Sequence, residues 1–331
     1  MGAAGLAFAA VLATAQQPPP SPPTRLQGVT VSRVLMEIRV LDGQGRPVKG
    51  LGPADIQARV EGKPVEVESL EWIGAPGSVL VPAPDGASAS APRSVVFLFQ
   101  KELDGSRNAG FLRMARRAED VIDSLAPGDR VAVASFDVHL RLWQDLTADR
   151  ERLHQAIEDG VVLNRRPKDS SADEGPALEE GLDETRARRA TSLEKALLVV
   201  GEALSGLPGD RSLVLVASHM GRNPRIPVDE AYAKAHNTLA SARVAVYSLD
   251  ITEADHHTLE LGLQAVAEGT GGFYARTHDF AAGATRRLEG ALEGHYLLTF
   301  PKPEGEPGFH PVELRLAHGE GTIFARPGYR D

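Results

Sequence analysis

Two places in the sequence combine side chains capable of nucleophilic, acid–base or metal chemistry. Ser218 and His219 are adjacent, and Asp250 is followed by His256 and His257. Neighbouring side chains on an extended strand point in opposite directions, so we expect Ser218 and His219 not to form a nucleophile–base pair. A carboxylate and two imidazoles can hold a metal ion, so Asp250, His256 and His257 define a hydrolase alternative.

The remaining sequence argues against an enzyme. It contains no G-x-S-x-G nucleophile elbow, no Walker phosphate loop and no G-x-G-x-x-G dinucleotide motif. It also contains no cysteine, which excludes thiolate metal sites, cysteine nucleophiles and disulfides. We expect His256 and His257 to begin a helix and His219 to be a loop residue facing solvent. The sequence therefore predicts a non-enzymatic protein, with no catalytic residues.

Composition and charge restrict the classes of partner. The chain has 331 residues, of which 42% are hydrophobic and 24% charged, as in a globular protein with one large and one small domain. Its formal net charge is −9 and no stripe of Lys and Arg stands out, so we expect no nucleic-acid binding. A protein partner of unknown identity is the remaining expectation.

The middle of the chain predicts the sheet that would position the candidate groups. Continuous apolar runs at 94–100, 130–136, 213–217 and 244–249 alternate with segments of helical periodicity. This alternation predicts an α/β fold with a doubly wound, mostly parallel sheet of the Rossmann-like type. Binding sites of such sheets lie at the carboxyl ends of the strands, where Ser218, His219 and Asp250 are expected.

Both ends of the chain have the pattern of β-strands. Residues 29–41 alternate and 65–72 form a second run, while 296–300, 311–317 and 322–325 are short runs between Gly/Pro turns. We expect the strands of the two ends to pair, forming a small β-sandwich-like domain into which the α/β domain is inserted. The open edge of this β domain is a second candidate binding surface.

The N-terminus predicts export. Gly2–Ala15 is apolar but too short to span a bilayer, and Ala13-Thr14-Ala15 fits a signal-peptidase pattern. We therefore expect a periplasmic or extracellular protein with no transmembrane segment in the mature chain. The expected organisation is a signal peptide at 1–15, a Pro-rich spacer at 16–26, β-domain strands at 27–73, a linker at 74–92, the α/β domain at 93–294 with a charged, flexible excursion at 164–189, and the rest of the β domain at 295–331.

Five segments together carry a resemblance to a known family: Ile38–Val67, Leu125–Leu153, Ala190–Leu197, Gly269–Phe280 and Phe324–Asp331. They resemble a von Willebrand factor A (VWA) domain and, more narrowly, the bacterial VWFA-related family of exported proteins. The resemblance implies a metal-ion-dependent adhesion site, in which a D-x-S-x-S loop, a Thr and a later Asp hold Mg²⁺ or Mn²⁺ for a partner's carboxylate. It also implies that Asp250 caps a loop, as matching members carry an Asp there.

This sequence departs from the family's metal pattern. Gln100 stands at the first Asp and Ser218 at the later Asp, whereas Glu102 and Asp104 occupy the two Ser positions and Thr191 is kept. The favoured interpretation is a degenerate site that binds protein without a metal or other cofactor. Its expected ligand-binding residues are Gln100, Glu102, Asp104, Thr191, Ser218 and His219.

The alternative is a metal-dependent adhesion module with a rearranged site. Glu102, Asp104 and Thr191 would then hold Mg²⁺ or Mn²⁺, although carboxylate stems are longer than Ser hydroxyls and Lys101 could neutralise one of them. A hydrolase that uses Asp250 and His256 or His257 is the less favoured third interpretation.

Overall fold

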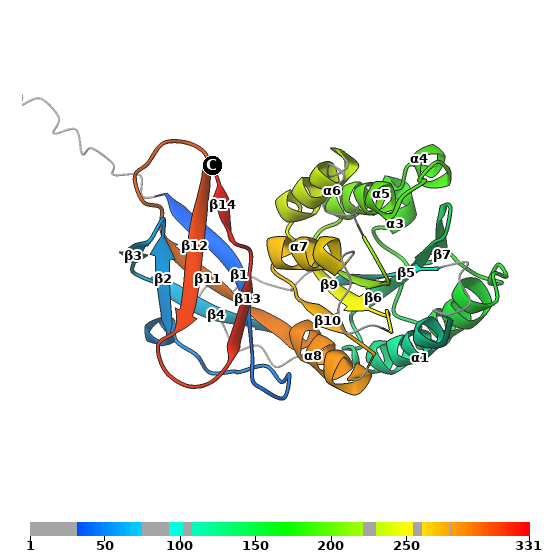
Figure 1. Cartoon of the computed structure of the whole chain (residues 1–331), viewed down its shortest axis with the longest axis horizontal. Coiled ribbons are helices and arrows are strands. Elements are labelled where there is room, and N and C mark those ends of the chain that lie inside the picture. Colours follow the sequence, from blue (N-terminus) through cyan, green and yellow to red (C-terminus); the bar gives the residue numbers. More distant parts are fainter. Residues whose placement is uncertain (1–31, 75–92, 102–107, 221–229, 254–259, 279) are drawn as a thin grey trace, which may run out of the picture. The chain divides into compact units, whose positions relative to one another are not determined.

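The computed structural model describes residues 32–74, 93–101, 108–220, 230–253, 260–278 and 280–331 (Figure 1). These lie in one compact unit, Ser32–Asp331. The signal peptide, the spacer and the linker expected from the sequence lie outside the described residues, except for Gly74, which ends a strand rather than beginning the linker. No helix in the described ranges combines the length and apolar character needed to cross a bilayer.

A six-stranded sheet forms the centre of the α/β part, and it confirms the predicted fold class. Its order is β10-β9-β8-β5-β6-β7. Five strands run parallel, namely β5 (Ser94–Gln100), β6 (Arg130–Phe136), β8 (Arg211–Ala217), β9 (Val244–Asp250) and β10 (Tyr274–Arg276). The edge strand β7 (Leu140–Thr147) runs antiparallel to β6.

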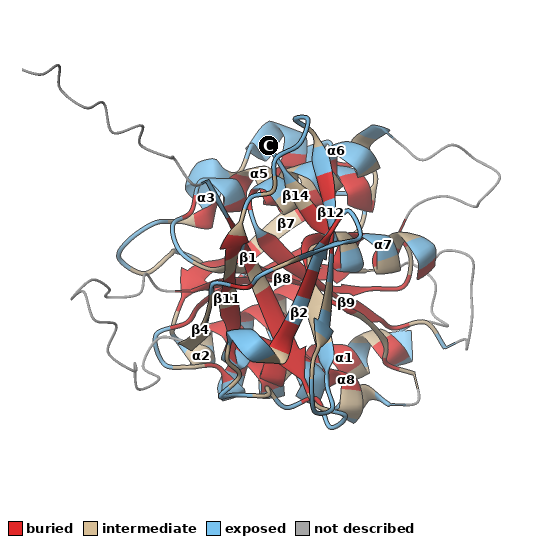
Figure 2. Cartoon of the chain, turned by 90° about the vertical axis from the view of Figure 1, so that its left-hand side faces the viewer, coloured by how far each residue is buried: buried red, intermediate tan, exposed pale blue. Residues whose placement is uncertain are grey.

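Helices cover both faces of this sheet (Figure 1). One face carries α3 (Leu178–Gly181), α4 (Glu184–Arg188), α5 (Leu193–Ser205), α6 (Glu230–Ser241) and α7 (Glu260–Thr270). The other carries α1 (Asn108–Ser124), α2 (Arg150–Gln155), a π-helical segment (Ala156–Val162) and α8 (Ala281–Glu293). Successive β5 residues alternate between the two cores, with Val96 in the first and Val95 and Phe97 in the second. Figure 2 shows the strands buried and the outer faces of α6 and α7 exposed.

Strands from both chain ends form two four-stranded sheets, as the sequence predicts. One sheet has the order β13-β1-β11-β4 and the other β14-β12-β2-β3. The first contains β1 (Arg33–Leu41), β4 (Ser69–Gly74), β11 (Gly294–Pro301) and β13 (Thr322–Ala325). The second contains β2 (Ile56–Val60), which follows a 3₁₀ turn at Pro53–Asp55, and β3 (Lys63–Val65), β12 (Phe309–Leu316) and β14 (Gly328–Arg330). One hydrophobic cluster, including Met36, Ile56 and Phe300, joins the two sheets.

One local expectation is wrong, and two further features were not expected. The run 65–72 is not one strand, because β3 ends at Val65 and β4 begins at Ser69. Helix α2 ends at Gln155 and continues as a π-helical segment, where Gly160 packs so closely on Trp143 that an added Cβ would lie 2.6 Å from its ring. Strand β7 was not expected, although Leu140 and Leu142 alternate there.

The charged excursion expected at 164–189 packs against the α/β part through a few buried side chains. Leu178 and Ala187 are buried in the core under α5. The carboxylate of Asp145 accepts hydrogen bonds from the backbone N–H groups of Leu178 at 2.8 Å and Glu179 at 3.1 Å. Segment 164–189 is therefore held by apolar contacts and by hydrogen bonds to a carboxylate. Most of its charged side chains lie on its exposed side.

Candidate functional site

Gln100 connects the carboxyl ends of β5 and β8. Its side-chain oxygen Oε1 accepts hydrogen bonds from the backbone N–H groups of Ser218 at 3.0 Å and His219 at 3.2 Å. Gln100 is 3% exposed, so these bonds form in a buried environment, where an unpaired N–H is costly. One amide thus fixes the loop after β8, at the edge of the sheet where binding was expected.

Ser218 and His219 contact each other, which the sequence argument had excluded. The Ser218 hydroxyl Oγ lies 3.0 Å from Nδ1 of His219, and Nε2 of His219 lies 3.4 Å from Nε2 of Gln100. The expectation is wrong because β8 ends at Ala217, so the pair lies in a loop rather than on an extended strand. Ser218 is only 1% exposed, so its hydroxyl is poorly placed to attack a substrate.

Thr191 lies at the start of α5, beside a lysine. It is exposed, and its hydroxyl Oγ1 accepts a hydrogen bond from Nζ of Lys195 at 3.1 Å. Ser192 caps α5 by accepting a bond from the Lys195 backbone N–H. Lys101 directly follows Gln100, and burial lowers the pKa of its ammonium group. Thr191 thus accepts a hydrogen bond from one lysine, and a second lysine directly follows Gln100 in the chain.

The three described candidate residues supply no acidic ligand for a divalent cation. Mg²⁺ and Mn²⁺ prefer carboxylate and other oxygen ligands with free lone pairs. Gln100, Thr191 and Ser218 offer neutral oxygens, and those of Gln100 and Thr191 already accept hydrogen bonds. Glu102 and Asp104, which the alternative interpretation requires, lie outside the described residues.

Asp250 holds the loop after β9, as the family resemblance implies. One carboxylate oxygen accepts from the Thr252 backbone N–H at 2.8 Å, and the other accepts from the Tyr274 hydroxyl at 2.7 Å. Burial raises the pKa of Tyr274, and the hydrogen bond to Asp250 raises it further. Both Asp250 oxygens therefore serve a structural role. His256 and His257, the other residues of the hydrolase alternative, lie outside the described residues.

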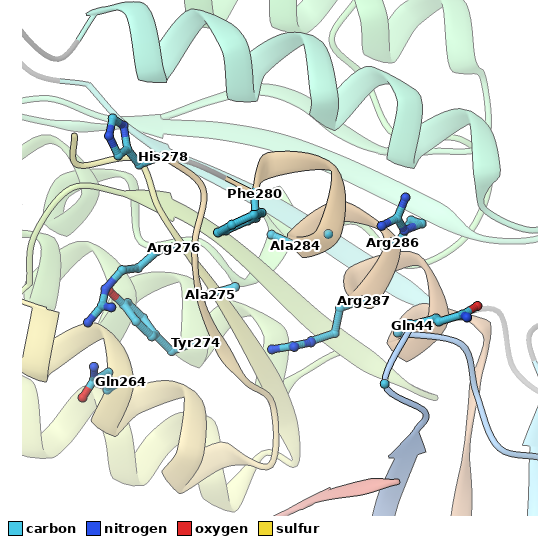
Figure 3. Close-up of a pocket in the computed structure, with 13 residues that line it drawn as sticks. Gln44, Gln264, Tyr274, Ala275, Arg276, His278, Phe280, Ala284, Arg286 and Arg287 are labelled. Carbon is cyan, nitrogen blue, oxygen red and sulfur yellow. The ribbon is translucent and has the colours of Figure 1, made fainter. Parts of the chain in front are cut away.

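A polar pocket that sequence reasoning missed lies along β10 and α8 (Figure 3). Its volume is 630 Å³, and Tyr274, Arg276, Phe280 and Arg287 line it. Arg276 is paired with Glu260 at 3.0 Å, and Arg287 lies 5.6 Å from the centre of the Phe273 ring. Figure 3 shows Arg287 extending toward Tyr274 from α8. No motif signals this pocket, because separate elements contribute its side chains.

A Glu/Asp/His group was also not foreseen. Ligand atoms of Glu37, Asp210 and His295 lie within 4.8 Å of one another, and Nδ1 of His295 is 3.1 Å from the Asp210 carboxylate. Burial opposes ionisation of Asp210, but the hydrogen bond from His295 and the charges of Arg39 and Arg93 lower its pKa to about 2. The nearby guanidinium groups supply the positive charge that a metal ion would bring, so we interpret the group as an ion-pair network.

Comparison with known proteins gives similar folds at low identity. No family model and no curated protein matches the chain. A structure of proximal thread matrix protein 1 from the mussel byssus is 16% identical, with a TM-score of 0.43, over 61% of this chain and 48% of that chain. The chain thus spans about half of that protein, which another structure shows with a zinc-occupied metal-ion-dependent adhesion site, at 15% identity and a TM-score of 0.42 over the same shares. A von Willebrand factor type A protein from Catenulispora acidiphila is 13% identical, with a TM-score of 0.42, over 91% of this chain and 72% of that chain.

Proposed function

We propose that this chain is an exported VWA-type module that binds a protein partner through the carboxyl edge of its α/β sheet without a metal ion. The observation that carries the proposal is the Gln100 bridge to the loop after β8. The resembled family has acidic metal ligands at the positions of Gln100 and Ser218. Here the amide of Gln100 holds the loop after β8 by two hydrogen bonds, and the Ser218 hydroxyl contacts His219 in that loop.

The proposal has a simple electrostatic basis. Two carboxylates at this edge would repel each other and require a cation between them. An amide oxygen instead accepts hydrogen bonds from backbone N–H groups and needs no cation. Replacing the acids therefore removes the need for a metal while keeping the loop after β8 in place. The exposed groups left for a partner are Thr191, Lys195 and the partly exposed His219, with Glu102 and Asp104 as further proposed contacts.

Calorimetric titration with Mg²⁺ and Mn²⁺ tests the metal independence. The wild-type chain should show no binding tighter than about millimolar, because the described oxygens are neutral and engaged. The matched control combines Gln100→Asp, Glu102→Ser, Asp104→Ser and Ser218→Asp, which restores the family pattern and should gain affinity. Tight binding by the wild type that is lost in Glu102→Ala or Asp104→Ala would support the metal-dependent alternative instead.

Partner binding and export need separate tests. Cross-linking in the native cell should retain fewer specific partners for His219→Glu and Lys195→Glu than for Arg315→Glu, a charge reversal on the exposed side of β12. Equal cross-linking by all three variants would argue against this edge. Fractionation of cells that express the chain with and without residues 1–15 tests export, since only the complete form should reach the periplasm or the medium.

A further inference from the structure

Strand β1 has one neighbour along its first half. Strand β11 pairs with Arg33–Ile38, whereas β13 pairs only with Ile38–Leu41. The backbone N–H of Lys302 donates to the Ser32 carbonyl at 2.9 Å, so Ser32 and every second residue after it face β11. Arg33, Leu35 and Glu37 therefore direct their backbone groups to the opposite edge, where no described strand pairs with them.

A groove of 1120 Å³ borders this edge. Its walls are the start of β1, the end of α6 and the C-terminal residues 326–331, elements that Figures 1 and 2 show near one another. Cationic side chains prevail among the described lining residues: Arg33, Arg243, Lys302, Arg326 and Arg330, against the single carboxylate side chain of Asp331. A strongly basic groove beside an open strand edge favours an acidic ligand.

Two of these cations are neutralised within the chain and the others are not. Arg33 pairs with Glu68 at 2.5 Å, and Lys302 pairs with Asp331 at 2.6 Å. Across the described ranges, Arg243, Arg326 and Arg330 form no ion pair within 4.0 Å. Arg326 donates to the Ala240 carbonyl at the end of α6, at 3.3 Å. Burial lowers the pKa of Arg326, and the charge of Arg243 lowers it further while Glu37 opposes the change.

Arg243 also has a strained backbone. It follows α6 with φ = 54°, a left-handed conformation in which glycine is the usual residue after a helix. A non-glycine residue there costs stability, and such strain gathers at functional positions. The exposed Arg243 side chain is therefore a candidate contact rather than a structural requirement.

We propose that this groove binds an extended acidic peptide of a partner protein, which adds as a strand to β1 beside Arg33–Glu37. The peptide backbone would satisfy the open edge, and its carboxylates would meet Arg243, Arg326 and Arg330. Leu35 and Phe309, which are 41% and 49% exposed, give apolar contacts to the alternate peptide side chains. The proposal rests on the proposed role in protein binding but concerns a second surface.

The chain's own N-terminal segment is a poor occupant of the groove. Residues 1–31 contain no Asp or Glu, so they cannot supply the missing carboxylates. Charge complementarity therefore favours an acidic segment from another protein.

The test uses the full chain and a labelled peptide with alternating Val and Glu, measured by fluorescence anisotropy at several salt concentrations. We expect saturable binding that weakens as salt rises, and a loss of roughly ten-fold in affinity for Arg326→Glu and for Arg243→Glu. Arg315→Glu, on the exposed side of β12, should bind as the wild type does. Circular dichroism of each variant shows whether it is folded.

Three further peptides decide the binding mode. A peptide with Lys in place of Glu should bind at least ten-fold more weakly. Two acidic peptides, one N-methylated at each Val and the other at each Glu, block one strand edge each, and at least one of them should bind ten-fold more weakly. Equal binding of the Glu and Lys peptides would overturn the acidic ligand, and undiminished binding of both methylated peptides would overturn strand addition. If the chain self-associates and Arg326→Glu abolishes that association, the occupant of the groove is a second copy of the chain and the proposed partner protein is overturned. Binding that survives in His219→Glu separates this proposal from the site at Gln100.

Discussion

Gln100 holds a neighbouring loop with a single neutral side chain. Its amide oxygen holds the loop after β8 through two backbone N–H groups, and its position is the one at which the resembled family has an Asp. The sequence predicted the departure from the family pattern but not the bond that replaces it. A side-chain amide has several hydrogen-bonding choices, and only the folded loop selects one of them.

Gln100→Leu should destabilise the chain by about 2 kcal/mol, because two buried N–H groups lose their acceptor at nearly constant side-chain volume. Urea denaturation at neutral pH measures the change. The matched control is Gln44→Leu in an exposed turn, which should alter the free energy of unfolding by less than about 0.5 kcal/mol. A loss equal to that of the control would show that the bridge contributes little.

Arg243→Gly should stabilise the chain by roughly 0.5–1 kcal/mol, because glycine adopts a φ of 54° without steric strain. The same variant should bind the acidic peptide more weakly, since it removes a groove cation. Arg243→Lys keeps the charge and the strain, so both stability and affinity should stay near the wild-type values. Thermal unfolding and anisotropy on the same samples separate the two effects, and unchanged peptide affinity in Arg243→Gly would exclude this side chain from the groove.

At the level of elements, close backbone contacts decide how α8 packs. Gly290 of α8 packs against the turn that follows β1. A Cβ added to Gly290 would lie 2.1 Å from the Gly45 carbonyl oxygen. Gly45 itself has φ = 82° and lies against the α8 backbone. The sequence marked this turn by its glycines, but not the helix against which it packs, because the two are far apart in the chain.

Gly290→Ala should therefore destabilise the chain by roughly 1–3 kcal/mol, since the helix and the turn must move apart. Gly283→Ala in the same helix is the control, because its nearest neighbour would lie at an ordinary contact distance of 3.9 Å. That variant should be neutral or stabilise the chain by about 0.5 kcal/mol through helix propensity. Similar free energies of unfolding for the two variants, measured in urea, would contradict the packing described for α8.

Across the whole described unit, charged groups connect the β strands to the α/β sheet. His295 of β11 contacts Asp210, which precedes β8. Arg39 of β1 donates to the Ala291 carbonyl of α8 at 3.3 Å. The inserted α/β part is thus joined to the strands of both chain ends by polar contacts as well as by apolar ones.

The Asp210 contact predicts a pH dependence. The fold lowers the pKa of Asp210 from its ordinary value of 3.8 to about 2, so the folded state favours the ionised carboxylate. This stabilisation, about 2 kcal/mol, is fully present above pH 4 and is lost as the pH falls from about 4 to 2. Asp210→Asn should lower the free energy of unfolding by a similar amount at pH 7 and by much less near pH 2. Asp120→Asn, whose side chain is 63% exposed, should show little change at either pH.

The sequence alone determined the type of each sheet and the joining of the chain ends. Runs that are apolar at every position require burial on both faces, as in β5 and β8, and alternation requires one buried face, as in most of β1. Tertiary structure alone decided the site geometry, because Gln100 and His219 meet across 119 positions of sequence. It also brought Arg33, Arg243 and Arg326 to one groove, since charge compensation depends on distances in space and not on spacing along the chain.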